Sequence, residues 1–214
     1  MITVNSRCGD GFVLRWQPMK ELLEGYVGIK FEAVCTASEV PSSASAGYPA
    51  FEGGGDRLRR HQMAPANGGN LSQQADDGMV ITTSGCNLGH IDAPELALVQ
   101  GCSLERERVV YAGAAAPSSE AMMHWLIYQH VPEARAVVHA HDELATSSAA
   151  ASRLRETPRE EPYGTVALAR LAVEAFAGGD RIIVLKNHGY VAYDDVDLAG
   201  AVDTVVQMHL RLIY

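Results

Sequence analysis

Short apolar runs separated by turn-forming residues recur along the chain and indicate a series of β-strands. The runs expected as strands cover residues 12–16, 27–34, 79–83, 96–99, 108–111, 136–138 and 181–185. The runs at 96–99 and 108–111 are close enough in sequence to pair as a hairpin. The pattern therefore distributes strands over the whole length of the chain.

Two segments carry the signals of a helix, and residues 92–95 are expected to begin a short helical turn. The clearest covers residues 118–130, with Ser118 as its N-cap and an amphipathic spread of apolar residues behind it. A second, short helix is expected over residues 56–63, with Asp56 as the candidate N-cap. Between residues 38 and 55 the chain is rich in Ser, Ala, Gly and Pro, which predicts a mobile surface loop.

Two histidines at the end of one predicted strand indicate a metal site. His139 and His141 follow the apolar run 136–138 and, because side chains alternate along a strand, they project from the same face. His188 lies where the run 181–185 empties into a turn. Three imidazoles suit zinc, leave positions open for water or substrate, and also fit other divalent metals. Two unrelated polar residues remain the alternative, since a His-x-His pair alone selects no metal.

Three donor-rich segments are suited to an anion. Residues 67–72 and 84–89 are glycine-rich turns that expose backbone N–H groups, and the helix start near residue 118 adds serine hydroxyls. The alternatives stay open: such turns are common structural punctuation, and Glu120 in the first helical turn could serve only to complement the helix dipole. His124 is expected as a helix-face histidine near the core.

Composition and charge narrow the classes of partner. The chain has 214 residues, 47% of them hydrophobic and 20% charged, which is ordinary for one globular domain. Its net charge of −9 argues against nucleic acid or an anionic membrane surface as the main partner. Four widely spaced cysteines without a CxxC pair are expected to be reduced thiols. Residues 1–5 show no basic region followed by an apolar run, so we expect a cytoplasmic protein without a membrane span.

Five short motifs, in this order, resemble those of the class II aldolase and adducin family. They are Gly69-Asn70-Leu71-Ser72, Thr83-Ser84-Gly85, Pro117-Ser118-Ser119-Glu120, His139-Ala140-His141 and Asn187-His188-Gly189. The resemblance covers about residues 56–214. It implies a class II aldolase/adducin-like domain over residues 56–214 and an N-terminal extension, residues 1–55, packed on that domain.

The resemblance also implies a fold and a set of roles. The implied fold is α/β, with three α/β/α layers around a central mixed, mostly antiparallel sheet, and the implied assembly is a homo-oligomer, usually a tetramer. His139, His141 and His188 match the zinc ligands of the family. Glu120 matches the acidic residue that moves protons at the substrate. The residues that match the substrate phosphate pocket are Asn70, Ser84, Gly85, Ser118 and Ser119.

The activity implied in this way is that of a zinc-dependent lyase, a class II aldolase of carbohydrate metabolism. Such an enzyme cleaves a phosphorylated ketose by retro-aldol chemistry through an enediolate that the metal stabilises. Two alternatives use the same metal and carboxylate: a methylthioribulose-1-phosphate-type dehydratase and a sugar-phosphate epimerase. A third alternative, from another class, is a non-catalytic, adducin-like interaction module. The metal ligands and Glu120 favour an enzyme over that module.

Overall fold

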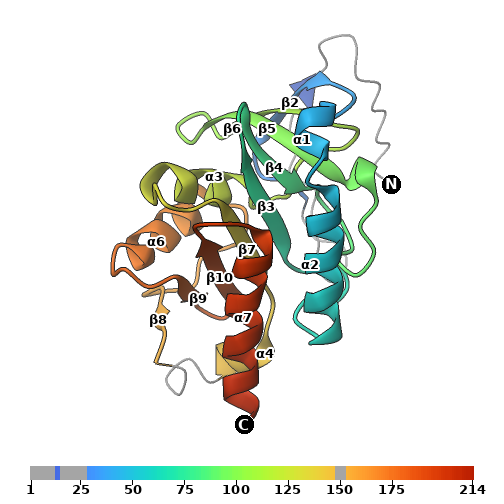
Figure 1. Cartoon of the computed structure of the whole chain (residues 1–214). Coiled ribbons are helices and arrows are strands. Elements are labelled where there is room, and N and C mark those ends of the chain that lie inside the picture. The colour runs from blue at the N-terminus through green and yellow to red at the C-terminus, as the bar shows by residue number, and fades with distance from the viewer. Residues whose placement is uncertain (1–12, 15–27, 148–152) are drawn as a thin grey trace.

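The protein is organised around one twisted sheet, seen in a computed structural model that describes residues 13–14, 28–147 and 153–214 (Figure 1). The described residues form ten strands in the order β1-β2-β6-β5-β4-β3-β7-β10-β9-β8. In chain order these strands are β1 Val13–Leu14, β2 Glu32–Ala37, β3 Asn70–Ala75, β4 Gly78–Thr82, β5 Leu96–Ser103, β6 Arg108–Ala112, β7 Ala136–Ala140, β8 Arg155–Glu156, β9 Ile182–Leu185 and β10 Gly189–Asp194. The strand predicted over residues 12–16 is seen as β1, and its remaining residues lie outside the described ranges.

Most neighbouring strands in this sheet run antiparallel. The exceptions are β2 with β6 and β8 with β9, which pair in parallel. The hairpin expected between residues 96–99 and 108–111 is present as β5 and β6. The expected mixed, mostly antiparallel sheet is therefore confirmed.

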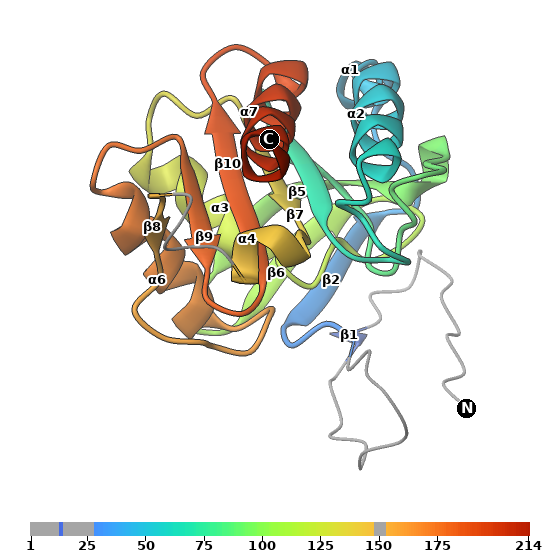
Figure 2. The same ribbon diagram turned by 90° about the horizontal axis from the view of Figure 1, so that it is seen from below.

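Helices cover both faces of the sheet, which gives the three expected layers (Figure 2). α2 (Tyr48–Arg60) and α7 (Leu198–Ile213) pack on one face, over a core that includes Leu71, Val138 and Tyr190. α3 (Ala121–His130) and α6 (Val166–Phe176) pack on the other. Shorter helices are α1 (Ser42–Ser45), η1 (Ala93–Glu95) and α4 (Glu143–Ser147). Alternate residues of β7 serve the two cores, so Val138 faces α7 while Val137 faces α3 and α6.

The loop predicted over residues 38–55 is wrong, because α1 and most of α2 occupy this segment. Three consecutive glycines, residues 53–55, suggested a loop, since glycine disfavours helix interiors. In the structure they allow close packing instead. A Cβ on Gly54 would stand 3.2 Å from Val202 Cγ2 of α7, and one on Gly55 would collide with the Leu88 carbonyl. The helix therefore begins at Tyr48, and Asp56 is not its N-cap.

The helix predicted over residues 118–130 is shorter at its start and less amphipathic than expected. α3 begins at Ala121 with Glu120 in the N-cap position, so the assignment of Ser118 as N-cap is wrong. The helix is buried on most of its surface because it lies between the sheet and α6. Similarly, the turn predicted at 67–72 ends early, because β3 begins at Asn70.

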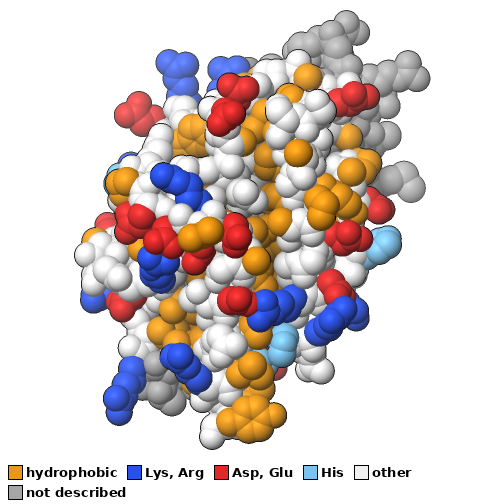
Figure 3. Space-filling view, viewed as in Figure 1, with side chains coloured by type: hydrophobic (Ala, Val, Ile, Leu, Met, Phe, Trp, Pro, Cys, Tyr) orange, Lys and Arg blue, Asp and Glu red, His pale blue; other side chains and the backbone are white. Residues whose placement is uncertain are grey.

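The segment before residue 56 contributes to the same sheet and core as the rest of the chain. β2 pairs with β6, and Phe31 and Phe51 are buried. The division at residue 55 remains a prediction. None of the helices in the described ranges is long and apolar enough to cross a membrane. On the face shown in Figure 3, basic and acidic side chains are interspersed.

Candidate metal centre and binding pocket

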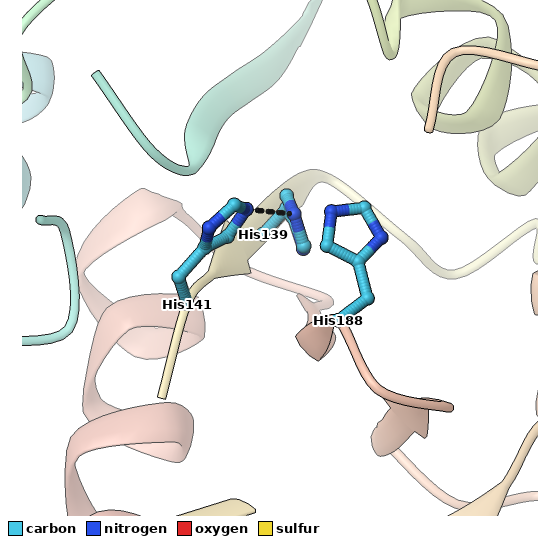
Figure 4. A group of neighbouring side chains, drawn as sticks. All are labelled: His139, His141 and His188. Atoms are coloured by element: carbon cyan, nitrogen blue, oxygen red, sulfur yellow. Dashed lines mark hydrogen bonds between the residues drawn. The ribbon is translucent and has the colours of Figure 1, made fainter. Parts of the chain in front are cut away.

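Three histidines from two neighbouring parts of the sheet converge on one point. His139 is on β7, His141 follows the end of this strand, and His188 lies in the turn between β9 and β10 (Figure 4). The ring centroids are 4.7 to 5.0 Å apart. One nitrogen from each ring lies within 4.8 Å of the other two. The structure therefore brings together the three histidines that the sequence singled out.

The imidazole of His139 is oriented as a metal ligand would be. Its Nδ1–H donates to the Tyr190 carbonyl at 2.8 Å, so its Nε2 carries the lone pair that faces the other rings. His139 Nε2 and His141 Nε2 are 2.9 Å apart. Nitrogen ligands of a tetrahedral zinc ion, bound at about 2.0–2.1 Å, stand about 3.3 Å apart, so the spacing needs little adjustment.

The protonation state of these rings also suits a metal. Burial, followed by the neighbouring His188, holds the pKa of His139 well below its usual value. Burial and His188 likewise lower the pKa of His141. Metal coordination requires neutral imidazole, so these two residues are prepared for it near neutral pH. The donor set fits zinc or a similar divalent ion.

Glu120 places a buried carboxylate beside the histidines. It is 3% exposed and lies 3.1 Å from His139 Nε2 through Oε2 and 3.9 Å from His188 Nε2 through Oε1. Asn70 Nδ2 donates to Oε2 at 2.9 Å, whereas Oε1 has no hydrogen-bond partner among the described residues. Burying a carboxylate oxygen without a hydrogen-bond partner costs free energy of folding. Here Oε1 faces the histidine cluster, where a bound cation or a proton of the substrate would give it a partner.

A cavity of about 110 Å³ opens directly over this cluster. Eight of the nine predicted site residues line it, and the ninth, His139, is fully buried beside Glu120. The lining residues are Asn67, Gly68, Gly69, Asn70, Thr83, Ser84, Gly85, Ser118, Ser119, Glu120, His141, Tyr163 and His188. Residues about 120 positions apart in sequence thus share one pocket.

Part of the predicted donor set has a structural task instead. The backbone N–H of Ser84 donates to the Ala116 carbonyl and that of Ser118 donates to Thr82, both at 2.9 Å. These bonds tie the turn after β4 to the segment before α3, with a β-bridge between Thr83 and Pro117. The expectation of free N–H groups is therefore wrong for Ser84 and Ser118.

Tyr163 lines the cavity and was not predicted from the sequence. It lies in the loop between β8 and α6, and its only sequence signal is the adjacent Gly164, which marks a turn. His124 was expected near the core and is fully buried behind the site. Ser72 Oγ lies 2.7 Å from His124 Nδ1 and 2.8 Å from the hydroxyl of Tyr128.

A second, larger cavity of about 230 Å³ lies elsewhere, between α1, α2 and the hairpin of β3 and β4. Its lining includes Ser43, Gln73 and Asp77. In the ranges that the structure describes, His139, His141 and His188 form the one group of three or more side chains placed to hold a metal. The candidate metal centre therefore lies at the smaller cavity.

A family model for the "Class II Aldolase and Adducin N-terminal domain" matches residues 54–210. A methylthioribulose-1-phosphate dehydratase of Pseudoalteromonas translucida is 35% identical over 92 residues, which are 43% of this chain and 41% of that protein. The chain thus spans about two fifths of the length of the dehydratases it matches.

The aldolases of the family match over a longer stretch. An L-fuculose phosphate aldolase of Methanococcus vannielii is 29% identical over 139 residues, 58% of this chain and 71% of that protein. Among solved structures, an L-fuculose 1-phosphate aldolase superposes with a TM-score of 0.65 at 27% identity, covering 82% of this chain and 87% of the other.

Proposed function

We propose that this chain, which belongs to the class II aldolase and adducin family, is a metal-dependent lyase that cleaves a phosphorylated ketose by a retro-aldol reaction. One observation carries the proposal: Glu120 lies beside three converging imidazoles on the floor of a cavity lined by hydroxyl and amide groups. A buried carboxylate that faces the cavity beside a metal site is suited to proton transfer at a bound substrate, which favours an enzyme over a binding module.

His139, His141 and His188 would hold the metal, with zinc as the expected ion. A divalent ion bound there supplies Lewis acidity toward the oxygens of the substrate. The chain's own contribution is to fix the ligands: the Tyr190 carbonyl orients His139, and the strand end places His141 beside it.

In cleavage, the hydroxyl on the carbon that leaves as the aldehyde loses its proton and the C–C bond breaks. Glu120 would supply a proton to the other carbon of that bond, which stays with the phosphate fragment. Asn70 holds its Oε2, so the unpartnered Oε1 is the oxygen available for this transfer. Burial excludes water from the carboxylate and keeps its geometry fixed. The reaction thus depends on a positioned acid–base group rather than on a mobile surface residue.

The substrate phosphate would bind at the rim, to Asn70, Ser84, Gly85, Ser118 and Ser119. Because the backbone amides of Ser84 and Ser118 are already bonded, the hydroxyl groups and the remaining amides would supply the donors. Such a site orients the sugar over the histidines, and its anchoring energy assists reaction at the far carbons.

The first test is the metal content of purified protein, compared with His141→Ala. We expect about one divalent ion per chain, and its loss in the variant. Ketose 1-phosphates should then be screened for an aldehyde product together with a three-carbon phosphate. Absence of metal from both proteins after reconstitution would refute the catalytic proposal and favour a non-catalytic, adducin-like module.

A second candidate function is dehydration of a ketose phosphate. It is favoured by the methylthioribulose-1-phosphate dehydratases, which match this chain at 35–36% identity over their shared segments. Dehydration needs the same proton transfer next to a carbonyl, but water leaves instead of an aldehyde. The screen separates the two, because a dehydratase gives one product that retains every carbon.

We further propose that the protein works as a homo-oligomer, with a tetramer expected, in the cytoplasm. The support is the family membership and the reduced state expected for its cysteines. Light scattering on the purified protein measures the number of subunits, and a monomer at working concentrations would contradict the proposal.

A further inference from the structure

The loop that carries Tyr163 is fixed on both sides of that residue. After it, the Thr165 hydroxyl donates back to the carbonyl of Pro162, on the other side of Tyr163, and accepts from the Leu168 amide at the start of α6. Gly164 has φ +69°, and its backbone packs against the Ser119 carbonyl. Before it, Glu160 accepts from the side chain of Asn187. The loop over residues 157–165, here called the strap, is therefore held in place, and its Tyr163 lines the cavity.

Lys30 holds Tyr163 in the middle of this strap. Its ammonium donates to the Tyr163 carbonyl at 2.6 Å and stands 4.2 Å from the centroid of the tyrosine ring. The same cation thus contacts both the backbone and the side chain of one residue. Figure 2 shows the start of β2, which Lys30 precedes, near the loop that leads into α6.

Lys30 forms no ion pair with any described residue. No carboxylate of the described residues lies within 4.0 Å of its ammonium. Burial lowers its pKa, and the negative charge of Glu120 opposes this effect. The contacts with Tyr163 compensate the ammonium for the part of its hydration that it loses.

We propose that Lys30 is a positioning residue that fixes Tyr163 as the wall of the cavity against which the carbon skeleton of the substrate packs. Among the described residues that line the cavity, Tyr163 alone has a large apolar face, since the others are polar or glycine. This role rests on the proposed function. It also gives the segment before residue 54, where the family match begins, a part in substrate selection.

The test uses the full-length, metal-loaded protein and two readouts. The first is amide hydrogen exchange of residues 157–165 in Lys30→Met, which keeps an unbranched side chain of nearly the same length and removes the charge and the hydrogen-bond donor. We expect exchange to rise about tenfold or more there, and to return toward the original rate in Lys30→Arg, which can donate and stack again. Arg181→Met is the matched control, because Arg181 lies over the ring of Tyr193, a residue outside the cavity lining.

The second readout is kinetic, with the ketose phosphate that the screen identifies. Lys30→Met should raise KM about tenfold while kcat changes less than about twofold, and it should have no further effect in a Tyr163→Ala background. Additive effects of the two substitutions would overturn the role through Tyr163. An unchanged KM would overturn the role in substrate selection.

The two proposals fail separately. If the hydrogen-exchange rates of residues 157–165 were unchanged in Lys30→Met, the positioning role of Lys30 would be refuted, whether or not the protein turns over any sugar phosphate. Conversely, suppose that the protein shows no turnover while Lys30→Met raises the exchange of the strap. That result would support the positioning role of Lys30 and refute the proposed lyase activity. Equal metal content in all variants shows that the histidine cluster is intact.

Discussion

Glu120 is the residue on which the proposed chemistry depends most directly. Replacing it by Gln keeps the shape of the side chain and an oxygen that accepts from Asn70, but removes the group that moves the proton. We expect Glu120→Gln to retain its metal and to lose kcat by about 10²- to 10⁴-fold. Glu174→Gln, on the exposed face of α6, is the control and should behave like the parent. Full activity in Glu120→Gln would remove this carboxylate from the mechanism.

The burial of His124 leads to a prediction about the pH dependence of stability rather than about catalysis. Burial lowers its pKa from 6.5 to about 4, against the opposing charge of Glu120. Between these two values the unfolded chain binds a proton that the folded chain does not. The free energy of unfolding should therefore fall as the pH falls through this window, by on the order of 2 kcal/mol at pH 5.

The measurement is urea unfolding at pH 7 and pH 5, in the presence of a chelator so that metal release does not contribute. His124→Gln cannot take up this proton, so its two unfolding free energies should differ less than those of the parent. His139 and His141 remain in both proteins. Their contribution largely cancels in the comparison, because burial and His188 are the main causes that lower their pKa values and His124 is the smallest cause named for His139. An equal pH dependence in the two proteins would assign the effect to other groups.

At the scale of elements, the sequence predicted strands better than helices. Strands such as β7 and β9 are buried on both faces and read as continuous apolar runs. Only the end of α2 was predicted, within the helix expected over residues 56–63. Its first part was missed, because Gly54 and Gly55 are present for contact with α7 and with the Leu88 loop, which are distant in sequence. Helix propensity is a poor guide at positions where contacts with distant parts of the chain require a particular residue, such as these glycines.

The candidate site shows the same division. The alternation along β7 placed His139 and His141 on one face without any knowledge of the fold. The contact of Lys30 with Tyr163 joins residues 133 positions apart, and no periodicity reports such a pair. Motifs therefore predicted the groups on single strands and turns, whereas the wall of the cavity required the structure.

The strap itself can be tested with a pair of glycines. Gly164 and Gly179 both have positive φ, but a Cβ on Gly164 would stand 2.8 Å from the Ser119 carbonyl, whereas one on Gly179 meets nothing within 4 Å. Gly179→Ala should lose about 1 kcal/mol of stability from backbone strain alone. Gly164→Ala should lose about 1–3 kcal/mol more and should raise KM, because the strap must move away from the start of α3.

Urea unfolding and steady-state kinetics on the two variants measure both effects. The difference between them removes the backbone strain that they share and leaves the contact with Ser119. If Gly164→Ala matched Gly179→Ala in stability and in KM, the close approach of Gly164 to the Ser119 carbonyl would have no role in positioning the strap.

At the scale of the whole molecule, strand order assembles the centre from distant parts of the chain. β7 lies between β3 and β10, so Asn70 is opposite His139 in one register and Tyr190 is opposite Ala140 in the other. In the unfolded chain nothing holds these residues next to one another. A metal that binds the three histidines together should therefore bind the folded protein almost exclusively, and its binding energy should add to the stability of the entire sheet.

This linkage predicts how far the protein responds to metal removal. At a free zinc concentration about 100 times Kd, the metal should add about 2.7 kcal/mol to the free energy of unfolding, and a chelator should abolish the gain. His141→Ala should unfold at the same point with and without zinc. His90→Ala, at an exposed histidine outside the cavity, should retain the full response. A zinc response of equal size in His141→Ala would place the bound metal elsewhere on the protein, and the centre at the end of β7 would lose its assignment.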